Sequence, residues 1–156
     1  MIVSDATALI TLINIDEFEV LSLFTEYIVI TPEVYAEVTE QAAAKIYIDT
    51  QKDKSFIVIK SYKDTAIFEA FCYVLDTGES ASIALALETK LPLIIDEKKG
   101  RKFAQMQGVK IIGLVGILKY LYKNETLSEK RIRSIITKLN ASDFRINPTL
   151  LMLILE

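Results

Sequence analysis

Histidine is absent from the 156 residues of the sequence, and this absence excludes several classes of enzyme. Hydrolases built on serine–histidine–aspartate or cysteine–histidine arrangements need an imidazole as the general base. Ribonucleases that relay protons through histidine, and zinc sites built with imidazole, are excluded for the same reason. Any hydrolysis by this protein must therefore depend on carboxylates, acting alone or through a hard metal ion that prefers oxygen ligands.

Cysteine is nearly absent as well, since Cys72 is the single example. One cysteine forms neither an internal disulfide nor a thiolate zinc cluster, and we expect a cytoplasmic protein. Hydrophobic runs are short: the apolar tail at residues 150–155 has only six residues, whereas a membrane-spanning helix needs about 20. The N-terminal residues contain no basic segment and no small-residue cleavage site, so we expect neither a signal peptide nor a membrane span.

Phosphate-binding loops are also missing. Gly108, Gly113 and Gly116 are too widely spaced for the glycine-rich turn of dinucleotide-binding proteins, and the P-loop pattern does not occur. The formal net charge of −3 argues against a protein that coats nucleic acid through its overall charge, because such proteins are usually basic. An enzyme that holds RNA through a local basic patch is still compatible with this charge.

Short apolar runs alternate with helical patterns along the chain. Strands are predicted at residues 2–4, 27–30, 56–59, 93–95 and 109–112. Helices are predicted at residues 6–14, 17–24, 32–48, 65–75, 80–87, 98–107, 114–122, 128–139 and 148–155. Because no linker or repeat divides the sequence, this alternation predicts a single α/β domain over residues 1–156, with an open, mostly parallel sheet.

Two aspartates directly follow predicted strands. Asp5 comes after the first strand, and Asp96 comes after the strand at 93–95. In an open parallel sheet, ligands bind outside the carboxyl ends of the strands, so both side chains are placed where a metal site would form. Each also has a structural alternative, since Asp5 precedes a helix that it could cap and Asp96 lies in a turn.

Further carboxylates lie on predicted helices. Glu33, Glu37 and Glu40 are spaced to share one helical face, where either solvent or a bound cation would offset their repulsion. Asp76 and Glu79 match a capping box, with Asp76 as the N-cap and Glu79 three residues later. For both groups, the sequence leaves a structural role and a role in a metal site open.

A basic run follows Asp96. It consists of Lys98, Lys99, Arg101 and Lys102. Such a run is usually the solvated face of a helix, but beside an acidic metal site it would hold a phosphate backbone. A second, weaker basic cluster consists of Lys130, Arg131 and Arg133.

Four stretches, in order along the chain, resemble PIN domains. They are residues 4–10, 31–38, 75–86, and 94–101 with 108–113. The first begins Ser-Asp-Ala-Thr, the second contains Thr-Pro-Glu-Val-Tyr-Ala-Glu-Val, the third contains Asp-Thr-Gly-Glu, and the fourth begins Ile-Ile-Asp-Glu-Lys-Lys-Gly-Arg. The resemblance spans nearly the whole chain and is closest to the prokaryotic PIN-like proteins related to VapC toxins.

The resemblance implies a three-layer α/β/α fold around a central, mostly parallel sheet, with an acidic pocket that binds Mg²⁺ or Mn²⁺. The family's catalytic and metal-binding carboxylates correspond to Asp5, Glu37, Glu79 and Asp96. Thr7 matches the family's small hydroxyl residue, and Asp76 and Glu97 are further candidates for ligands or supporting groups. Glu79 stands where many PIN domains have an aspartate, so its longer side chain changes the expected metal geometry.

The resemblance also implies an activity and partners. The expected function is metal-dependent hydrolysis of RNA phosphodiester bonds by the toxin component of a toxin–antitoxin pair. A small antitoxin and a second copy of the chain are the expected protein partners. The apolar tail at 150–155 must then be buried in the core or in such an interface.

Two other functions are considered. A PIN-fold protein could be catalytically silent and act through protein contacts, although four retained candidate carboxylates argue against a purely structural role. A receiver-like phosphoacceptor domain also uses aspartates at strand ends. It would need an acidic pair after the first strand and a lysine after the last, whereas Asp5 stands alone and Gly113 follows the last strand.

Overall fold

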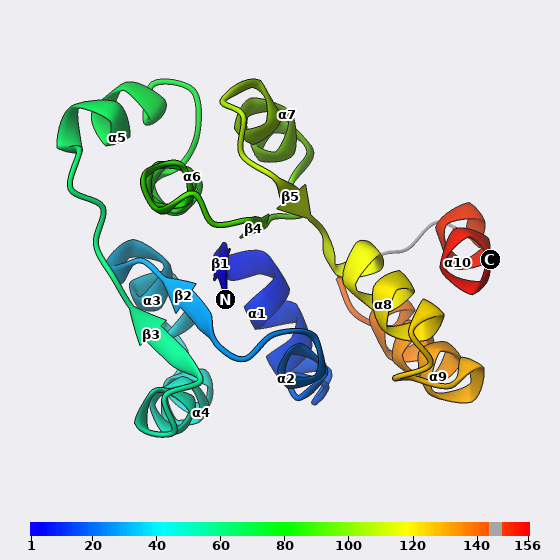
Figure 1. The fold of residues 1–156 in the computed structure, drawn as a ribbon. Coiled ribbons are helices and arrows are strands. Elements are labelled where there is room, and N and C mark those ends of the chain that lie inside the picture. Colours follow the sequence, from blue (N-terminus) through cyan, green and yellow to red (C-terminus); the bar gives the residue numbers. More distant parts are fainter. Residues whose placement is uncertain (144–147) are drawn as a thin grey trace.

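The computed structural model describes residues 1–143 and 148–156, and its centre is a five-stranded sheet. The strands are β1 (Ile2–Ser4), β2 (Ile28–Ile30), β3 (Ile57–Ile59), β4 (Leu93–Ile94) and β5 (Ile111–Ile112). Every pairing is parallel, and the strand order is β3-β2-β1-β4-β5 (Figure 1). All five strands lie within the predicted ranges, and the expected α/β sheet is confirmed.

Helices connect the strands and continue after the last of them. They are α1 (Ala6–Asn14), α2 (Val20–Phe24), α3 (Pro32–Val38), α4 (Ala42–Asp53), α5 (Thr65–Phe71), α6 (Thr77–Thr89), α7 (Lys98–Met106), α8 (Leu114–Lys123), α9 (Glu129–Asn140) and α10 (Pro148–Leu155). The predicted helices at 17–24 and 65–75 are shorter in the structure, where they correspond to α2 and α5, and the one at 80–87 is longer and corresponds to α6.

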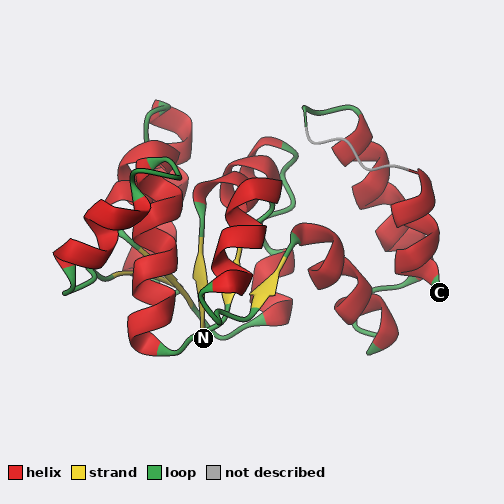
Figure 2. Cartoon of the chain, turned by 90° about the horizontal axis from the view of Figure 1, so that it is seen from above, coloured by secondary structure: helices red, strands yellow, loops and turns green. Residues whose placement is uncertain are grey.

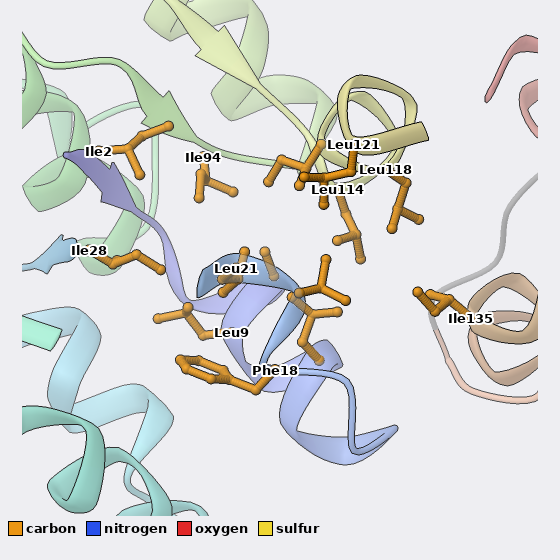
Figure 3. Close-up of a cluster of buried hydrophobic side chains, with 14 of the residues drawn as sticks. Ile2, Leu9, Phe18, Leu21, Ile28, Ile94, Leu114, Leu118, Leu121 and Ile135 are labelled. Atoms are coloured by element: carbon orange, nitrogen blue, oxygen red, sulfur yellow. The ribbon is translucent and has the colours of Figure 1, made fainter. Parts of the chain in front are cut away.

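The sheet is buried between two hydrophobic layers, because successive residues of a strand point to opposite faces. Ile2, Ile28 and Ile94 face a large core that α1, α2, α8 and α9 help to form (Figure 3). Val3 and Leu93 face a smaller core built with α5, α6 and α7. Figure 1 shows the strands between these two sets of helices, which is the expected three-layer α/β/α arrangement, and Figure 2 shows the same chain from above, with helices in front of the strands.

One predicted helix is wrong: residues 32–48 form two helices, α3 and α4, separated at residues 39–41. At the end of α3 the Thr39 hydroxyl donates a hydrogen bond to the Tyr35 carbonyl at 2.6 Å, and such side-chain bonds compete with helix continuation. Each helix buries its own apolar residues, and in the sequence the apolar spacing of the two short helices looks like that of one long amphipathic helix. Glu40 therefore lies outside α3, and the three predicted glutamates do not share one helical face.

The C-terminal helix packs against α8, and its apolar character is only partly covered. Ile154 is fully buried, whereas Met152 is 66% and Leu153 is 40% exposed. The expected burial in the core holds for Ile154, whereas burial of Met152 and Leu153 in an interface stays a prediction. In the described part of the chain, no helix combines the length and hydropathy needed to cross a membrane.

A buried ion pair fastens α9 to the start of the chain. Glu17 is only 2% exposed, and its carboxylate accepts hydrogen bonds from Arg131 at 2.6 Å and from Lys138 at 2.8 Å. Burial raises the pKa of Glu17, but the hydrogen bonds and charges of the two cations outweigh it, so the pKa is lowered. The second basic cluster predicted from the sequence is therefore partly committed to this contact.

We expect Glu17→Gln to lower the free energy of unfolding by about 2–3 kcal/mol, because it leaves two partly buried cations without their counter-charge. Since the pKa of Glu17 is lowered on folding, its contribution is present above about pH 4.5 and is lost as the pH falls further. Urea denaturation followed by circular dichroism measures both effects.

Glu129→Gln is the matched control, since its exposed pair with Arg133 contributes only about 0.3–0.5 kcal/mol. Equal urea midpoints for the two variants would contradict the assignment.

Candidate active site

The carboxyl ends of β1 and β4 lie side by side at the point where the strand order reverses. After β1 the chain adds β2 and β3 on one side of the sheet, and then β4 and β5 on the other. Asp5 follows β1 directly, and its backbone amide donates a hydrogen bond to the Ile94 carbonyl of β4 at 2.9 Å. Asp96 follows β4 after one further residue, Ile95. The topology therefore brings the two predicted aspartates to the place where open α/β sheets bind ligands.

The start of α6 is surrounded by three carboxylates. A side-chain carbon added to Gly78 would lie 2.8 Å from Glu37 Oε2, 3.7 Å from Asp5 Oδ1 and 3.8 Å from Asp76 Oδ1. Oxygens from β1, α3 and the N-cap of α6 thus converge on one small volume, which is open because residue 78 has no side chain. Gly78 is not among the residues predicted from the sequence, although its position next to Glu79 in the Asp-Thr-Gly-Glu motif was the available signal.

The predicted cap of α6 is present, but it uses only half of a capping box. Asp76 Oδ1 accepts a hydrogen bond from the Glu79 amide at 2.8 Å. The Glu79 side chain, which is 7% exposed, extends the other way, toward Glu97. Its Oε1 would lie 3.2 Å from a side-chain carbon added to Gly100, near the start of α7. Glu79 is therefore part of the carboxylate cluster and not only a helix cap.

Asp96 is held by the helix that follows the last strand. Its Oδ1 and Oδ2 accept hydrogen bonds from the Leu114 amide, at 3.0 and 3.3 Å, at the N-terminus of α8. Asp96 thus binds the start of α8 and does not cap α7, which follows it, and the N-terminus of α8 also favours its negative charge. By contrast, Asp5 occupies the N-cap position of α1 without making a capping bond through its side chain. Its carboxylate accepts a hydrogen bond from the adjacent Ala6 amide, and its Oδ1 lies beside the space at Gly78.

Burial and mutual repulsion raise the pKa values of this cluster. Burial, opposed in part by a hydrogen bond from the Ala6 amide and reinforced by neighbouring carboxylates, raises the pKa of Asp5 to about 7. Burial, together with the charges of Asp76 and Asp5, raises the pKa of Glu79 to about 7 as well. Burial is also the main reason why the pKa values of Glu37 and Asp96 are raised.

Raised carboxylate pKa values show that the site holds negative charge poorly without a cation. The donor set, made only of carboxylate oxygens, is the chemistry that Mg²⁺ and Mn²⁺ prefer. Among the described residues, however, no three acidic side chains stand in a complete metal-binding arrangement. The cluster thus fits a hard divalent ion in charge and ligand type, while its side chains are spread more widely than a closed coordination shell requires.

The other predicted acidic and hydroxyl residues have different surroundings. Glu33 accepts a hydrogen bond from the Tyr62 hydroxyl at 2.9 Å, so this end of α3 faces another residue and not the carboxylate cluster. Thr7 is exposed on α1, two residues after Asp5. Glu97 caps α7 by accepting a hydrogen bond from the Gly100 amide at 2.8 Å, in addition to its contact with Glu79.

The predicted basic run divides into two groups on α7. Lys98, Lys99 and Lys102 are exposed to solvent beside the cluster. Arg101 is half-buried and turned inward, and its Nη1 donates a hydrogen bond to the Ile95 carbonyl at 2.8 Å. Only the three lysines are free to meet a phosphate backbone without rearrangement. In the second basic cluster, Arg131 is paired with Glu17 and Arg133 with Glu129.

Comparison with models of known families matched the whole chain to one of them. A family model described as a PIN domain matches residues 1–156, the whole of the sequence. A search of curated proteins found no match.

Proposed function

The chain belongs to the PIN-domain family, whose members are generally nucleases and usually use divalent metal ions, and on that premise we propose that it is a metal-dependent endoribonuclease. The observation that carries the proposal is the convergence of Asp5, Glu37 and Asp76 on the space above Gly78, with Asp96 at the adjacent strand end. Carboxylates from distant parts of the sequence gather at the ligand-binding edge of the sheet. The raised pKa values of Asp5 and Asp96 are those expected of a cation site, and they favour the enzyme over a catalytically silent interaction module.

Each carboxylate has a distinct part in the proposed reaction. Asp5 and Asp96 would hold Mg²⁺ or Mn²⁺, since they lie at the ends of neighbouring strands on a rigid sheet. When bound, the ion would lower the pKa of a water molecule and stabilise charge on the scissile phosphate and the leaving oxygen. Glu37 is the most exposed of the four carboxylates, and we assign it to orienting the water and accepting its proton. Glu79 would share in holding the ion.

Three supporting residues keep this arrangement in place. Asp76 and Glu97 fix the starts of α6 and α7 through their capping bonds, and their charges add to the demand for a cation. Thr7 offers an exposed hydroxyl near Asp5, where it can donate a hydrogen bond to a substrate phosphate or a bound water. Together they orient the reacting groups without taking part in the bond changes.

The biological setting follows from the likeness to VapC toxins. We propose that the protein is the toxin of a toxin–antitoxin pair in the cytoplasm, and that a segment of a small antitoxin covers the carboxylate site. The exposed Met152 and Leu153 of α10 support a protein interface, and a second copy of the chain is the proposed occupant.

The test is cleavage of a mixed single-stranded RNA by the partner-free chain with Mn²⁺, with and without EDTA. We expect the wild type to cleave the RNA and EDTA to abolish this cleavage. Asp96→Asn should not cleave. Asp53→Asn, which replaces an exposed aspartate on α4, should cleave like the wild type. Absence of cleavage by the wild type would favour the alternative, a PIN-fold module that acts by protein contact. Equal cleavage by Asp96→Asn and wild type would refute the proposed site.

The three exposed lysines of α7 are proposed to hold the RNA backbone. Replacing Lys98, Lys99 and Lys102 together by glutamine should weaken RNA binding at low salt, and the slope of log affinity against log salt should fall by about 2 for single-stranded RNA. Fluorescence anisotropy with Asp96→Asn as the background measures binding without cleavage. Lys54→Gln, at the C-cap of α4, is the control and should leave the slope unchanged, because α4 and α7 lie on opposite sides of the sheet (Figure 1). An unchanged slope in the triple variant would exclude these lysines as phosphate contacts.

A further inference from the structure

Arg101 makes contacts that set it apart from the lysines around it. It lies one turn into α7, and its Nη1 donates a hydrogen bond to the carbonyl of Ile95, the residue immediately before Asp96. A side-chain carbon added to Gly113 would lie 2.7 Å from Arg101 Nη1 and 2.6 Å from Asp96 Oδ1. The guanidinium and the carboxylate therefore both occupy the space beside Gly113. The backbone of Gly113 is in an ordinary extended conformation, with φ −103°, so the glycine is needed for room and not for its conformation.

Asp96 consequently has Leu114 on one side, as its hydrogen-bond partner, and Arg101 on the other, as a nearby positive charge. The Leu114 amide holds its carboxylate from α8, and Arg101 places a positive charge next to it from α7. The same charge lowers the pKa of Asp96, in opposition to the effect of burial. A guanidinium suits this position because its donors lie in one rigid plane, so the nitrogen that binds the Ile95 carbonyl also keeps the positive charge beside the carboxylate.

We propose that Arg101 is a positioning residue, which fixes the turn after β4 and the carboxylate of Asp96 in the orientation that a divalent ion requires, in the space that Gly113 leaves open. The inference rests on the proposed function, since it takes Asp96 as a metal ligand. It assigns Arg101 a different task from the exposed lysines of α7: it acts on metal affinity, whereas they act on RNA affinity. Groups that orient a metal ligand typically change metal affinity by about 10- to 100-fold when they are removed.

The experiment compares Mn²⁺ binding with RNA binding in the same set of variants. Mn²⁺ affinity is measured without RNA, from the electron paramagnetic resonance signal of free Mn²⁺. RNA affinity and its salt slope are measured by anisotropy in EDTA. We expect Arg101→Gln to weaken Mn²⁺ binding by about 10-fold or more and to leave the salt slope of RNA binding unchanged. Lys102→Gln should show the reverse pattern.

Two further variants test whether any loss of Mn²⁺ affinity in Arg101→Gln results from misfolding. Arg101→Lys keeps the charge without the planar fork, and we expect it to restore part of the Mn²⁺ affinity. Gly113→Ala, which adds a carbon within 3 Å of both partners, should weaken Mn²⁺ binding while the arginine is still present. Urea midpoints in EDTA identify any variant that fails to fold, and the conclusion then rests on the others.

The outcomes separate this inference from the proposed function. If Arg101→Gln binds Mn²⁺ like the wild type and lowers the salt slope of RNA binding, Arg101 is a phosphate contact and the inference is wrong. If the wild type itself binds no Mn²⁺, the proposed function fails and this inference fails with it. Weakened Mn²⁺ binding in both Arg101→Gln and Gly113→Ala, with an unchanged slope, establishes the positioning role.

Discussion

Replacing Asp5 by asparagine is expected to abolish RNA cleavage and, in the absence of metal, to make the protein more stable. Asp5 is 4% exposed, and burial raises the pKa of its carboxyl to about 7. Ionising such a group in the folded state costs free energy that only a bound cation returns. Asparagine has nearly the same shape as aspartate but carries no charge. The substitution therefore removes the free-energy cost of a buried charge, and it also removes the carboxylate that would bind the metal. We expect a fall in cleavage of more than about 100-fold, because the loss of a ligand should exceed that of a group that merely orients one.

The pH dependence of stability follows from the direction of the pKa shift. Below about pH 4, Asp5 is protonated in both the folded and the unfolded chain. Between pH 4 and 7 the unfolded chain has lost this proton while the folded protein, with its pKa of about 7, retains it. The free energy of unfolding of the metal-free protein therefore falls as the pH rises through this window, and is nearly constant above it. Glu79, whose pKa is also raised to about 7, adds to the same trend.

Urea denaturation in EDTA at pH 5 and pH 8 measures this effect. We expect the wild type to be less stable at pH 8, and Asp5→Asn to be more stable than the wild type there by about 2–3 kcal/mol. At pH 8, Mn²⁺ at about 100 times its dissociation constant should stabilise the wild type by about 2.7 kcal/mol and should have little effect on Asp5→Asn. Asp53→Asn, which is exposed on α4, is the control for the substitution itself. If the wild type is equally stable at both pH values and Mn²⁺ does not change its stability, Asp5 is not a destabilising buried charge that a metal ion neutralises.

The sequence contains enough information to place the strands and the two aspartates that follow them. Asp5 and Asp96 could be placed because parallel strands share one carboxyl edge, a rule that needs no knowledge of side-chain contacts. The capping bond of Asp76 could be predicted for a similar reason, because it depends on residues three positions apart. Glu37 and Glu79 were assigned from the family resemblance, since local patterns favoured a solvated face and a cap.

What the sequence could not provide depends on contacts between distant residues. The pair of Glu17 with Arg131 joins residues 114 positions apart, and nothing near either residue indicates the other. The sequence places Arg101 in the same basic run as its lysine neighbours, because helical spacing does not reveal that its side chain binds the Ile95 carbonyl. The break between α3 and α4 could not be predicted because the local pattern itself is ambiguous. Two short helices in succession gave an apolar pattern that one long helix would also give.

Gly78 provides the most discriminating prediction, because Gly78→Ala should separate stability from activity. An added methyl group would lie 2.8 Å from Glu37 Oε2, and the end of this exposed, flexible side chain can move away at little cost. Alanine also favours a helix more than glycine, by up to about 1 kcal/mol, so stability should be unchanged or slightly higher. Cleavage should fall by about 100-fold, because the displaced carboxylate no longer lies next to Asp5 and a shift of about 1 Å at a reacting group has an effect of this size.

Gly108→Ala is the matched control, because its expected effects are the reverse. Gly108 has φ +82° and no atom within 4 Å of an added side-chain carbon, so alanine meets strain in the backbone and none from neighbours. We expect a loss of about 1 kcal/mol in the free energy of unfolding with cleavage close to that of the wild type. Initial cleavage rates and urea midpoints of the two variants, measured side by side, decide the matter. If Gly78→Ala cuts RNA as fast as Gly108→Ala does, the space above residue 78 does not hold the reacting groups, and the site must be placed elsewhere along the carboxyl edge of the sheet.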